Sequence, residues 1–222
     1  MKIKKIFAFS LAEVLVAMTI IGIVAALTVP TVFSNHQKRA YLVSIEKTYT
    51  DINQVMSLFI VTELVKDISR SYLTVKKSDP EEADLENSAG RFFTKYFNVA
   101  QVCGTTLTPC FADSYGNIDG NKTSALDCSG YSVSLKNGTA LCLEPPTSTG
   151  GNFTPGQLFI DTNGNKDPNI GGRDMFRLEI FNDGTITSTY DNTTDYTTTC
   201  KSSVDGDECL QSIIKNKWVM DY

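Results

Sequence analysis

Residues 8–33 read "AFSLAEVLVAMTIIGIVAALTVPTVF", and from Phe9 to Phe33 nearly every side chain is apolar or small. An α-helix of this length spans about 37 Å, because each residue adds about 1.5 Å, so the segment can cross a bilayer with some tilt. The residues before it, "MKIKKIF", carry three lysines and no acid. Because basic flanks stay in the cytoplasm, we expect a cytoplasmic N-terminus and an external remainder.

Glu13 is the only charged side chain between Phe9 and Phe33. A carboxylate at membrane depth costs typically about 3 kcal/mol and usually marks a function. One simple interpretation is a secretory signal peptide cut after Ala26, where "VAA" supplies small residues, although Glu13 within its apolar region argues against it. Another is a plain signal anchor in which the carboxylate reaches the membrane interface. Neither gives Glu13 a role.

The helix is expected to continue beyond the apolar run, to about Leu64. Apolar residues recur at spacings of three and four, which places them on one stripe of a helix. The stripe consists of Leu42, Ile45, Tyr49, Ile52, Met56 and Phe59. We expect it to pack on the globular domain of the same chain. Gly22 and Pro30 are the only helix breakers before it.

The remaining sequence predicts a small antiparallel sheet, and hence an α+β fold. Asn137-Gly138 lies between two alternating segments, which is a strong hairpin signal. Further strands are expected at Leu158–Asp161, Met175–Phe181 and, after an Asp183-Gly184 turn, Thr185–Tyr190. Short helices are expected after Pro80, at Arg91–Val99 and near the C-terminus, followed by a last strand from Lys217. The expected organisation is a leader (1–8), an apolar helix (9–33), its amphipathic continuation (34–65) and a globular domain (66–222).

All six cysteines follow the apolar segment, and their even number suits disulfides in an oxidising compartment. No pair has the C-x-x-C spacing and the only histidine is the distant His36, so zinc or free thiols are weaker alternatives. A preference for short loops favours Cys200–Cys209, Cys103–Cys110 and Cys128–Cys142, although other pairings stay open.

The N-terminus resembles the type IV pilins and the type II secretion pseudopilins. Their precursors have a short basic leader, a small residue at the cut site, and then Phe-Thr-Leu-Ile-Glu at the start of an apolar helix. Here Ala8 is followed by "FSLAE", which ends at Glu13, and Pro30 lies where the family commonly has a helix-bending proline. Ala8 for glycine, Ser10 for threonine and Ala12 for isoleucine are departures that bear on the efficiency of cleavage. More loosely, "DTNGNKDPNIGGRDMF" and "KNKWVMDY" resemble a late loop and a closing strand of such domains.

The resemblance implies cleavage between Ala8 and Phe9 by a prepilin peptidase, which also methylates the new amine. Glu13 of one subunit would then face that cation on a neighbour, which offsets the burial of both charges and sets the register between helices. Pro30 lacks an N–H, and the resemblance suggests that the helix unwinds there during assembly. The expected partners are other pilins or pseudopilins, the peptidase, an inner-membrane assembly platform and membrane lipid. The expected location is the bacterial inner membrane, spanned once, and then a filament or the cell surface.

A loop in the globular domain carries alternating oxygen ligands, which suit calcium. The candidate ligands are Asp161, Asn163, Asn165, Asp167 and Asp174. The EF-hand pattern fails, because its glutamate position falls on Gly172. Calcium binding by some secretion pseudopilins favours the metal, whereas Asn and Asp that cap their own backbone are the alternative.

We expect no enzymatic activity, since no nucleophile motif, phosphate loop or zinc-protease helix is present in the sequence. The net charge of −5 and the lack of a basic patch argue against nucleic-acid binding. Two classes of function stay open: a structural subunit that polymerises through its N-terminal helix, and a membrane-anchored binding module, calcium-dependent or not, that never polymerises.

Overall fold

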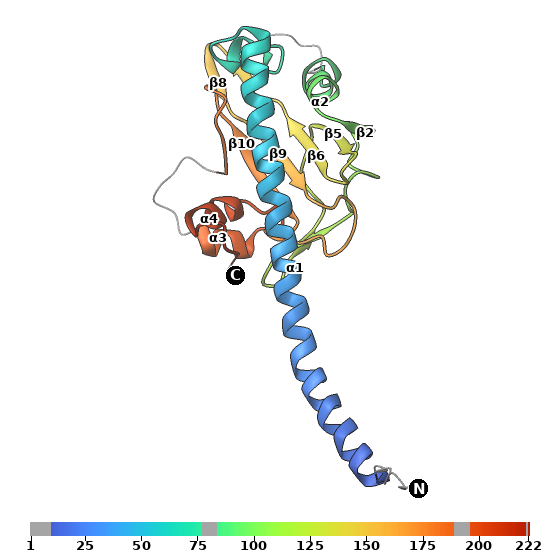
Figure 1. Ribbon diagram of the computed structural model, residues 1–222. Coiled ribbons are helices and arrows are strands. Elements are labelled where there is room, and N and C mark those ends of the chain that lie inside the picture. The colour runs from blue at the N-terminus through green and yellow to red at the C-terminus, as the bar shows by residue number, and fades with distance from the viewer. Residues whose placement is uncertain (1–9, 77–83, 189–195, 221) are drawn as a thin grey trace, which may run out of the picture. The chain divides into compact units, whose positions relative to one another are not determined.

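Helix α1 (Leu11–Glu63) runs without a break through Gly22 and Pro30, close to the limits that the sequence predicts (Figure 1). The computed structural model describes residues 10–76, 84–188, 196–220 and 222. The chain divides into two units at Ala40 and Tyr41. The first unit contains the apolar part of α1, and the second contains the rest of α1 and all the strands.

Six antiparallel strands form the main sheet of the second unit, in the order β11-β10-β9-β6-β5-β2. Their bounds are β2 (Val99–Gly104), β5 (Tyr131–Leu135), β6 (Ala140–Glu144), β9 (Gly156–Asp161), β10 (Met175–Ile180) and β11 (Ile186–Thr187). The predicted hairpin at Asn137-Gly138 is confirmed, and it joins β5 to β6. Gly138 has φ +92°, a conformation that glycine adopts without strain. Of the predicted third strand, residues 189 and 190 lie outside the described part.

The predicted stripe on α1 packs on this sheet (Figure 1). Ile45, Ile52, Met56 and Phe59 are at most 2% exposed. They share one core with alternate residues of the central strands, which are Leu141, Leu143, Leu158, Ile160, Phe176, Leu178 and Ile180. Alternate residues of a strand face the same side of a sheet, so the pairing register of β6, β9 and β10 places these side chains together on the face that α1 covers.

Phe59 lies at the centre of an aromatic cluster near the end of α1. Its ring contacts those of Tyr72, Phe92 and Tyr96 edge-on, with centroids 5.4–5.7 Å apart. Phe92 and Tyr96 belong to α2 (Arg91–Tyr96), which is shorter than the predicted helix because Val99 already begins β2. The cluster therefore fixes α2 against α1.

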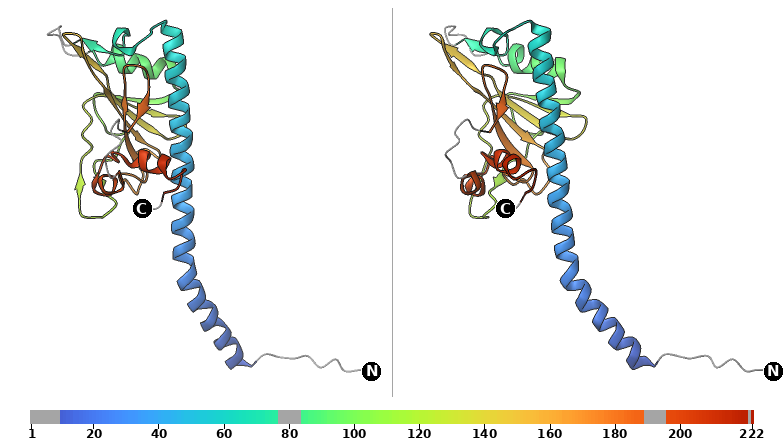
Figure 2. Two further views of the ribbon diagram at one scale, coloured as in Figure 1. Left: turned by 90° about the vertical axis from the view of Figure 1, so that its left-hand side faces the viewer. Right: turned by 60° about the vertical axis from the view of Figure 1, so that its left-hand side comes forward.

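The opposite face of the sheet carries a second core under the segment that joins β2 to β5. Figure 2 shows this green segment on the other side of the sheet from α1. Phe111, Tyr115 and Phe159 are at most 1% exposed there. The segment contains the two-stranded sheet of β3 (Tyr115–Gly116) and β4 (Thr123–Ser124).

Smaller elements complete the second unit. A three-stranded sheet joins β1 (Val75–Lys76), β7 (Thr147–Thr149) and β8 (Asn152–Thr154), with β1 parallel to β7. A 3-10 turn lies at Ile68–Arg70, and a π-helical turn at Glu86–Gly90 precedes α2. Helices α3 (Tyr196–Ser202) and α4 (Cys209–Lys215) follow the main sheet. A helix start was predicted after Pro80, and residues 81–83 of that segment lie outside the described part of the chain.

The prediction of a last strand from Lys217 is wrong. Helix α4 ends in a Schellman motif, in which Trp218 N–H donates to Ile213 O (2.9 Å) and Lys217 N–H to Ile214 O (3.1 Å). Lys217 and Trp218 have φ +54° and +61°, so the chain folds back and does not extend. The Trp218 ring then packs against Tyr49 of α1, with centroids 6.1 Å apart.

Candidate processing and assembly site

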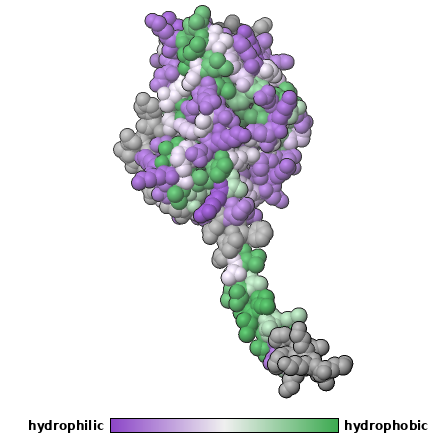
Figure 3. Space-filling view, viewed as in Figure 1, coloured by the Kyte–Doolittle hydropathy of each residue, from purple (hydrophilic) through white to green (hydrophobic). Residues whose placement is uncertain are grey.

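The first unit exposes an apolar helix surface. Leu11–Val29 is long and apolar enough to cross a membrane, and none of its best apolar window is buried. Leu11, Met18 and Leu27 are 82%, 67% and 72% exposed. Figure 3 shows hydrophobic side chains over the visible face of this segment. Surface of this kind needs lipid or other apolar helices around it.

Ser10 and Glu13 close the start of α1 with reciprocal hydrogen bonds. The N–H and Oγ–H of Ser10 donate to Glu13 Oε2 at 2.8 and 2.9 Å, and Glu13 N–H donates to Ser10 Oγ at 3.3 Å. This is a capping box, in which the residue before the helix and the third residue within it satisfy each other's polar groups. Ser10 was not among the predicted site residues. The S-x-x-E spacing in "SLAE" is the sequence signal that identifies it.

The other predicted processing and assembly residues are Ala8, Phe9 and Pro30. Ala8 and Phe9, on either side of the expected cut, lie outside the described residues. The backbone at Pro30 is helical, so in this structure α1 is not unwound there. A Cβ added to Gly22 would meet nothing within 4 Å, so no other described part of the unit packs closely against this glycine.

The comparisons with known proteins bear on this segment. The described chain joins an exposed apolar helix, whose first turn is closed by Ser10 and Glu13, to an α+β unit with three disulfides. Residues 3–29 match the family described as the prokaryotic N-terminal methylation motif, which is the signature of type IV pilins and pseudopilins. Searches of curated proteins and of solved structures gave no match.

Three disulfides occur in the second unit. They join Cys103 to Cys110, Cys128 to Cys142 and Cys200 to Cys209, which are the pairs that short loops favour. The first two lie beside the second core, and the third joins α3 to α4. Gly172 packs against this third disulfide so closely that an added Cβ would lie 2.6 Å from Cys209 Sγ.

The predicted calcium loop contains two buried carboxylates that are already hydrogen-bonded. Asp161 and Asp174 are both 0% exposed. Tyr115 O–H donates to Asp161 Oδ2 at 2.5 Å, while two backbone N–H groups donate to Asp174 at 2.7 and 2.9 Å. Burial raises the pKa of Asp161 to about 7, and it also raises the pKa of Asp174. Each carboxylate is therefore held by groups of its own chain.

Asn163 and Asp167 contact the loop itself, and Asn165 contacts the segment between β2 and β5 at Pro109. Asn163 Nδ2 donates to two backbone carbonyls, Asn165 Nδ2 donates to Pro109 O, and Asp167 Oδ1 accepts from an asparagine amide. In the part of the chain that is described, no three Asp, Glu, His or Cys side chains are grouped to hold a metal. Asn163 Oδ1 has no hydrogen-bond partner among the described residues, whereas Asp161 and Asp174 would have to exchange hydrogen bonds for a metal. Calcium binding thus stays a prediction, which an absence of heat in a calorimetric titration would contradict.

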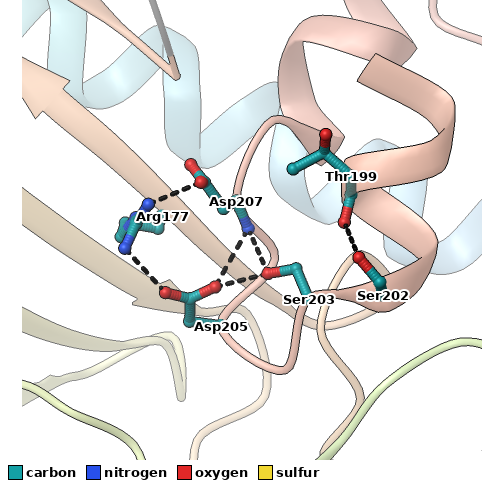
Figure 4. Close-up of polar contacts among 6 residues, drawn as sticks. All are labelled: Arg177, Thr199, Ser202, Ser203, Asp205 and Asp207. Atoms are coloured by element: carbon teal, nitrogen blue, oxygen red, sulfur yellow. Dashed lines mark hydrogen bonds and ion pairs between the residues drawn. The ribbon is translucent and has the colours of Figure 1, made fainter. Parts of the chain in front are cut away.

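A second polar centre, which the sequence did not suggest, lies between β10 and the loop that joins α3 to α4. The guanidinium of Arg177 contacts Asp205 at 2.9 Å and Asp207 at 2.5 Å (Figure 4). Ser203 Oγ–H donates to Asp205 and accepts from Asp207 N–H, which orders the loop. All three charged side chains are 22–27% exposed, so solvent screens the pairs only in part.

Proposed function

We propose that this chain is a structural subunit, a pilin or pseudopilin, which is cut between Ala8 and Phe9, methylated at Phe9, and polymerised through α1. The observation that carries the proposal is the methylation motif over residues 3–29, followed by an apolar helix with a single acid near its start. A prepilin peptidase is the expected processing enzyme. The role is structural, and the expectation that the chain is not an enzyme stays a prediction.

Physical chemistry supports assembly through the apolar helix. In the inner membrane, lipid covers Leu11–Val29, with the N-terminus in the cytoplasm and the globular unit outside. In a filament, neighbouring α1 helices would replace the lipid. A carboxylate in such surroundings is stabilised by an opposite charge, and the methylated amine of Phe9 on an adjacent subunit supplies one. The pair of Glu13 and that amine would also fix how far one helix is displaced along the next.

The experiment replaces Glu13 by leucine in the full chain, in cells that have the assembly machinery. We expect normal membrane insertion and no incorporation into a filament. The new N-terminus is measured in the same cells, so that a loss of cleavage is not mistaken for a loss of assembly. Wild-type incorporation of a correctly cleaved Glu13→Leu chain would contradict the proposal and favour a membrane-anchored binding module.

The receiving assembly is either a type IV pilus or a type II secretion pseudopilus, on an inner-membrane platform. Deleting the gene separates them. Loss of surface filaments with intact protein export indicates the pilus, and loss of export with intact filaments indicates the pseudopilus.

A further inference from the structure

We propose that Asn121, at the exposed turn that joins β3 to β4, is an acceptor site for an N-linked glycan. The sequence "DGNKT" from Asp119 to Thr123 contains the Asn-x-Thr pattern of such sites, with an acid two residues before the asparagine. Bacterial oligosaccharyltransferases require that acid in addition to the Asn-x-Ser/Thr pattern. These enzymes act on the external side of the membrane, so the inference rests on the proposed function for the location of the second unit.

The three groups that such an enzyme recognises are accessible in the fold. All five residues from Asp119 to Thr123 are exposed. Within the described part of the chain, the Asp119 carboxylate, the Asn121 Nδ2 atom and the Thr123 hydroxyl make no hydrogen bond or ion pair. The amide oxygen of Asn121 accepts a hydrogen bond from Asn117 Nδ2 at 2.8 Å. Nδ2 of Asn121, the atom that would carry the glycan, is therefore left without a partner.

The structure of the turn does not depend on the groups that the enzyme would use. Asn117 is 2% exposed, and its Oδ1 accepts from the backbone N–H groups of Asn121 and Lys122 at 3.1 and 2.9 Å. Asn117 Nδ2 also donates to Lys201 O at 3.1 Å, which ties the turn to α3. A buried asparagine thus holds the turn from below. A glycan on Asn121 Nδ2 leaves all these hydrogen bonds in place.

Three further Asn-x-Thr patterns lack the acid. They begin at Asn137, Asn152 and Asn192, and the residues two positions before them are Leu135, Gly150 and Tyr190. Asn192 lies outside the described residues. At Asn137 the fold adds a second obstacle, because Thr139, the threonine of that pattern, is 1% exposed. The enzyme should therefore modify Asn121 and leave Asn137 and Asn152 unmodified.

The glycan donor is an oligosaccharide that is linked through C1 of its first sugar to a polyprenyl diphosphate in the membrane. Asn121 Nδ2 attacks C1, so an N–C1 bond forms and the C1–O bond to the diphosphate breaks. The lipid diphosphate leaves, and a carboxylate of the enzyme accepts the proton that Nδ2 loses. The product is a bulky, solubilising group on the surface of the globular unit.

The position of the turn is compatible with assembly. The segment that contains β3 and β4 lies on the other side of the main sheet from α1 (Figure 2). A glycan there does not cover α1, so glycosylated subunits still assemble through this helix. Asn121→Gln should therefore lose the glycan and keep wild-type incorporation into filaments.

The test is peptide mass spectrometry of the full chain, purified from the membranes of the cells that produce it. Chymotrypsin releases the peptide from Gly116 to Leu126, which contains Asn121 and no other Asn-x-Thr pattern. We expect the mass of this peptide to be raised by that of an oligosaccharide, with fragmentation placing the sugar on Asn121. An unmodified peptide would overturn the inference, and so would a sugar on Thr123 or Ser124.

Two substitutions of one residue test the recognition. Asp119→Ala removes the acid, and we expect the modified fraction of the peptide to fall about tenfold, as loss of a charge-assisted contact does. Asp119→Glu keeps a carboxylate and should restore the modification. Asn152→Gln is the control for an exposed asparagine without the acid, and it should leave the glycan mass of the chain unchanged. If Asp119→Ala were modified as fully as the wild type, the inference would fall.

The N-terminus of the same purified chain separates this inference from the proposed function. A chain that begins at Phe9 with an unmodified Asn121 would overturn this inference alone. A chain that begins at Leu27 or Met1 would overturn the proposed function, whatever the state of Asn121.

Discussion

The guanidinium of Arg177 lies 2.9 Å from the carboxylate of Asp205, and this ion pair ties the central strand β10 to the loop between α3 and α4. The loop is also closed by the Cys200–Cys209 disulfide. Ser203 bridges Asp205 and Asp207, so both carboxylates are presented to one guanidinium (Figure 4). The structure of this loop therefore depends on a cation from the sheet as well as on the disulfide.

Replacing Arg177 by alanine should destabilise the fold by about 1–2 kcal/mol, because the two acids then lie close together without their cation. The measurement is urea unfolding of the full chain in detergent. Arg70→Ala is the control, since Arg70 is 80% exposed and contacts Asp67 at 3.4 Å. Its effect should stay within about 0.5 kcal/mol. Equal effects of the two substitutions would show that the Arg177 pairs contribute no more than a surface contact.

Gly206 in the same loop should tolerate no side chain. Gly206 and Gly120 have φ +72° and +70°, so alanine is strained by about 1 kcal/mol or more at both positions. A Cβ at Gly206 would lie 2.1 Å from Met175 O, whereas one at Gly120 meets nothing within 4 Å. We expect Gly206→Ala to cost at least about 3 kcal/mol, and Gly120→Ala about 1–2 kcal/mol. Thermal unfolding of both variants tests this, and similar losses would mean that the loop moves away from β10 at little cost.

Stability should fall as the pH rises towards 7, through the buried Asp161. Its pKa is about 7 in the fold, whereas an unfolded aspartate ionises near pH 3.9. Between these values the folded state binds more protons than the unfolded state, so the free energy of unfolding decreases as pH increases. Asp161→Asn should remove about 2–4 kcal/mol of this decrease between pH 4 and 8. Denaturant unfolding across that range measures it. If Asp161→Asn kept the pH dependence of the wild type, the carboxylate would reach water in the folded state.

Two adjacent residues of α1 should differ sharply in their contribution to stability. Phe59 is 0% exposed in the aromatic cluster, while Leu58 is 55% exposed. Phe59→Ala should cost about 3–5 kcal/mol, through lost burial and the cavity left behind, and Leu58→Ala less than about 1 kcal/mol. The free energies of unfolding of the two variants provide the comparison. A large loss at Leu58 would mean that this face of α1 is covered.

Local patterns predicted much of the fold. The apolar spacing from Leu42 to Phe59 predicts a continuous helix because a helix places such residues on one side. The Asn137-Gly138 pair predicts the hairpin because its turn needs left-handed backbone. Lys217 and Trp218 also adopt left-handed backbone, but the sequence did not predict it, because neither lysine nor tryptophan commonly has a positive φ. The positive φ values belong to the Schellman motif, and Trp218 then packs on Tyr49.

Contacts between distant segments were less predictable. Nothing in the neighbourhood of Arg177 indicates that Asp205 will lie beside it, because the ion pair depends on the path of the chain through α3. The alternation of Asp and Asn from Asp161 to Asp167 suggests a metal site, yet in the fold Tyr115 and backbone N–H groups donate hydrogen bonds to the carboxylates of Asp161 and Asp174. Ser10 is the opposite case, since the capping box was readable in "SLAE".

Mass spectrometry of the N-terminal peptide, from protein purified from the membranes of the cells that produce it, tests the central claim most directly. We predict a chain that begins at Phe9 and carries a methyl group on its amine. A chain that begins at Leu27 would identify a signal peptide, and one that retains Met1 would identify a plain anchor. Either result would contradict the claim that Glu13 serves assembly with a neighbouring amine.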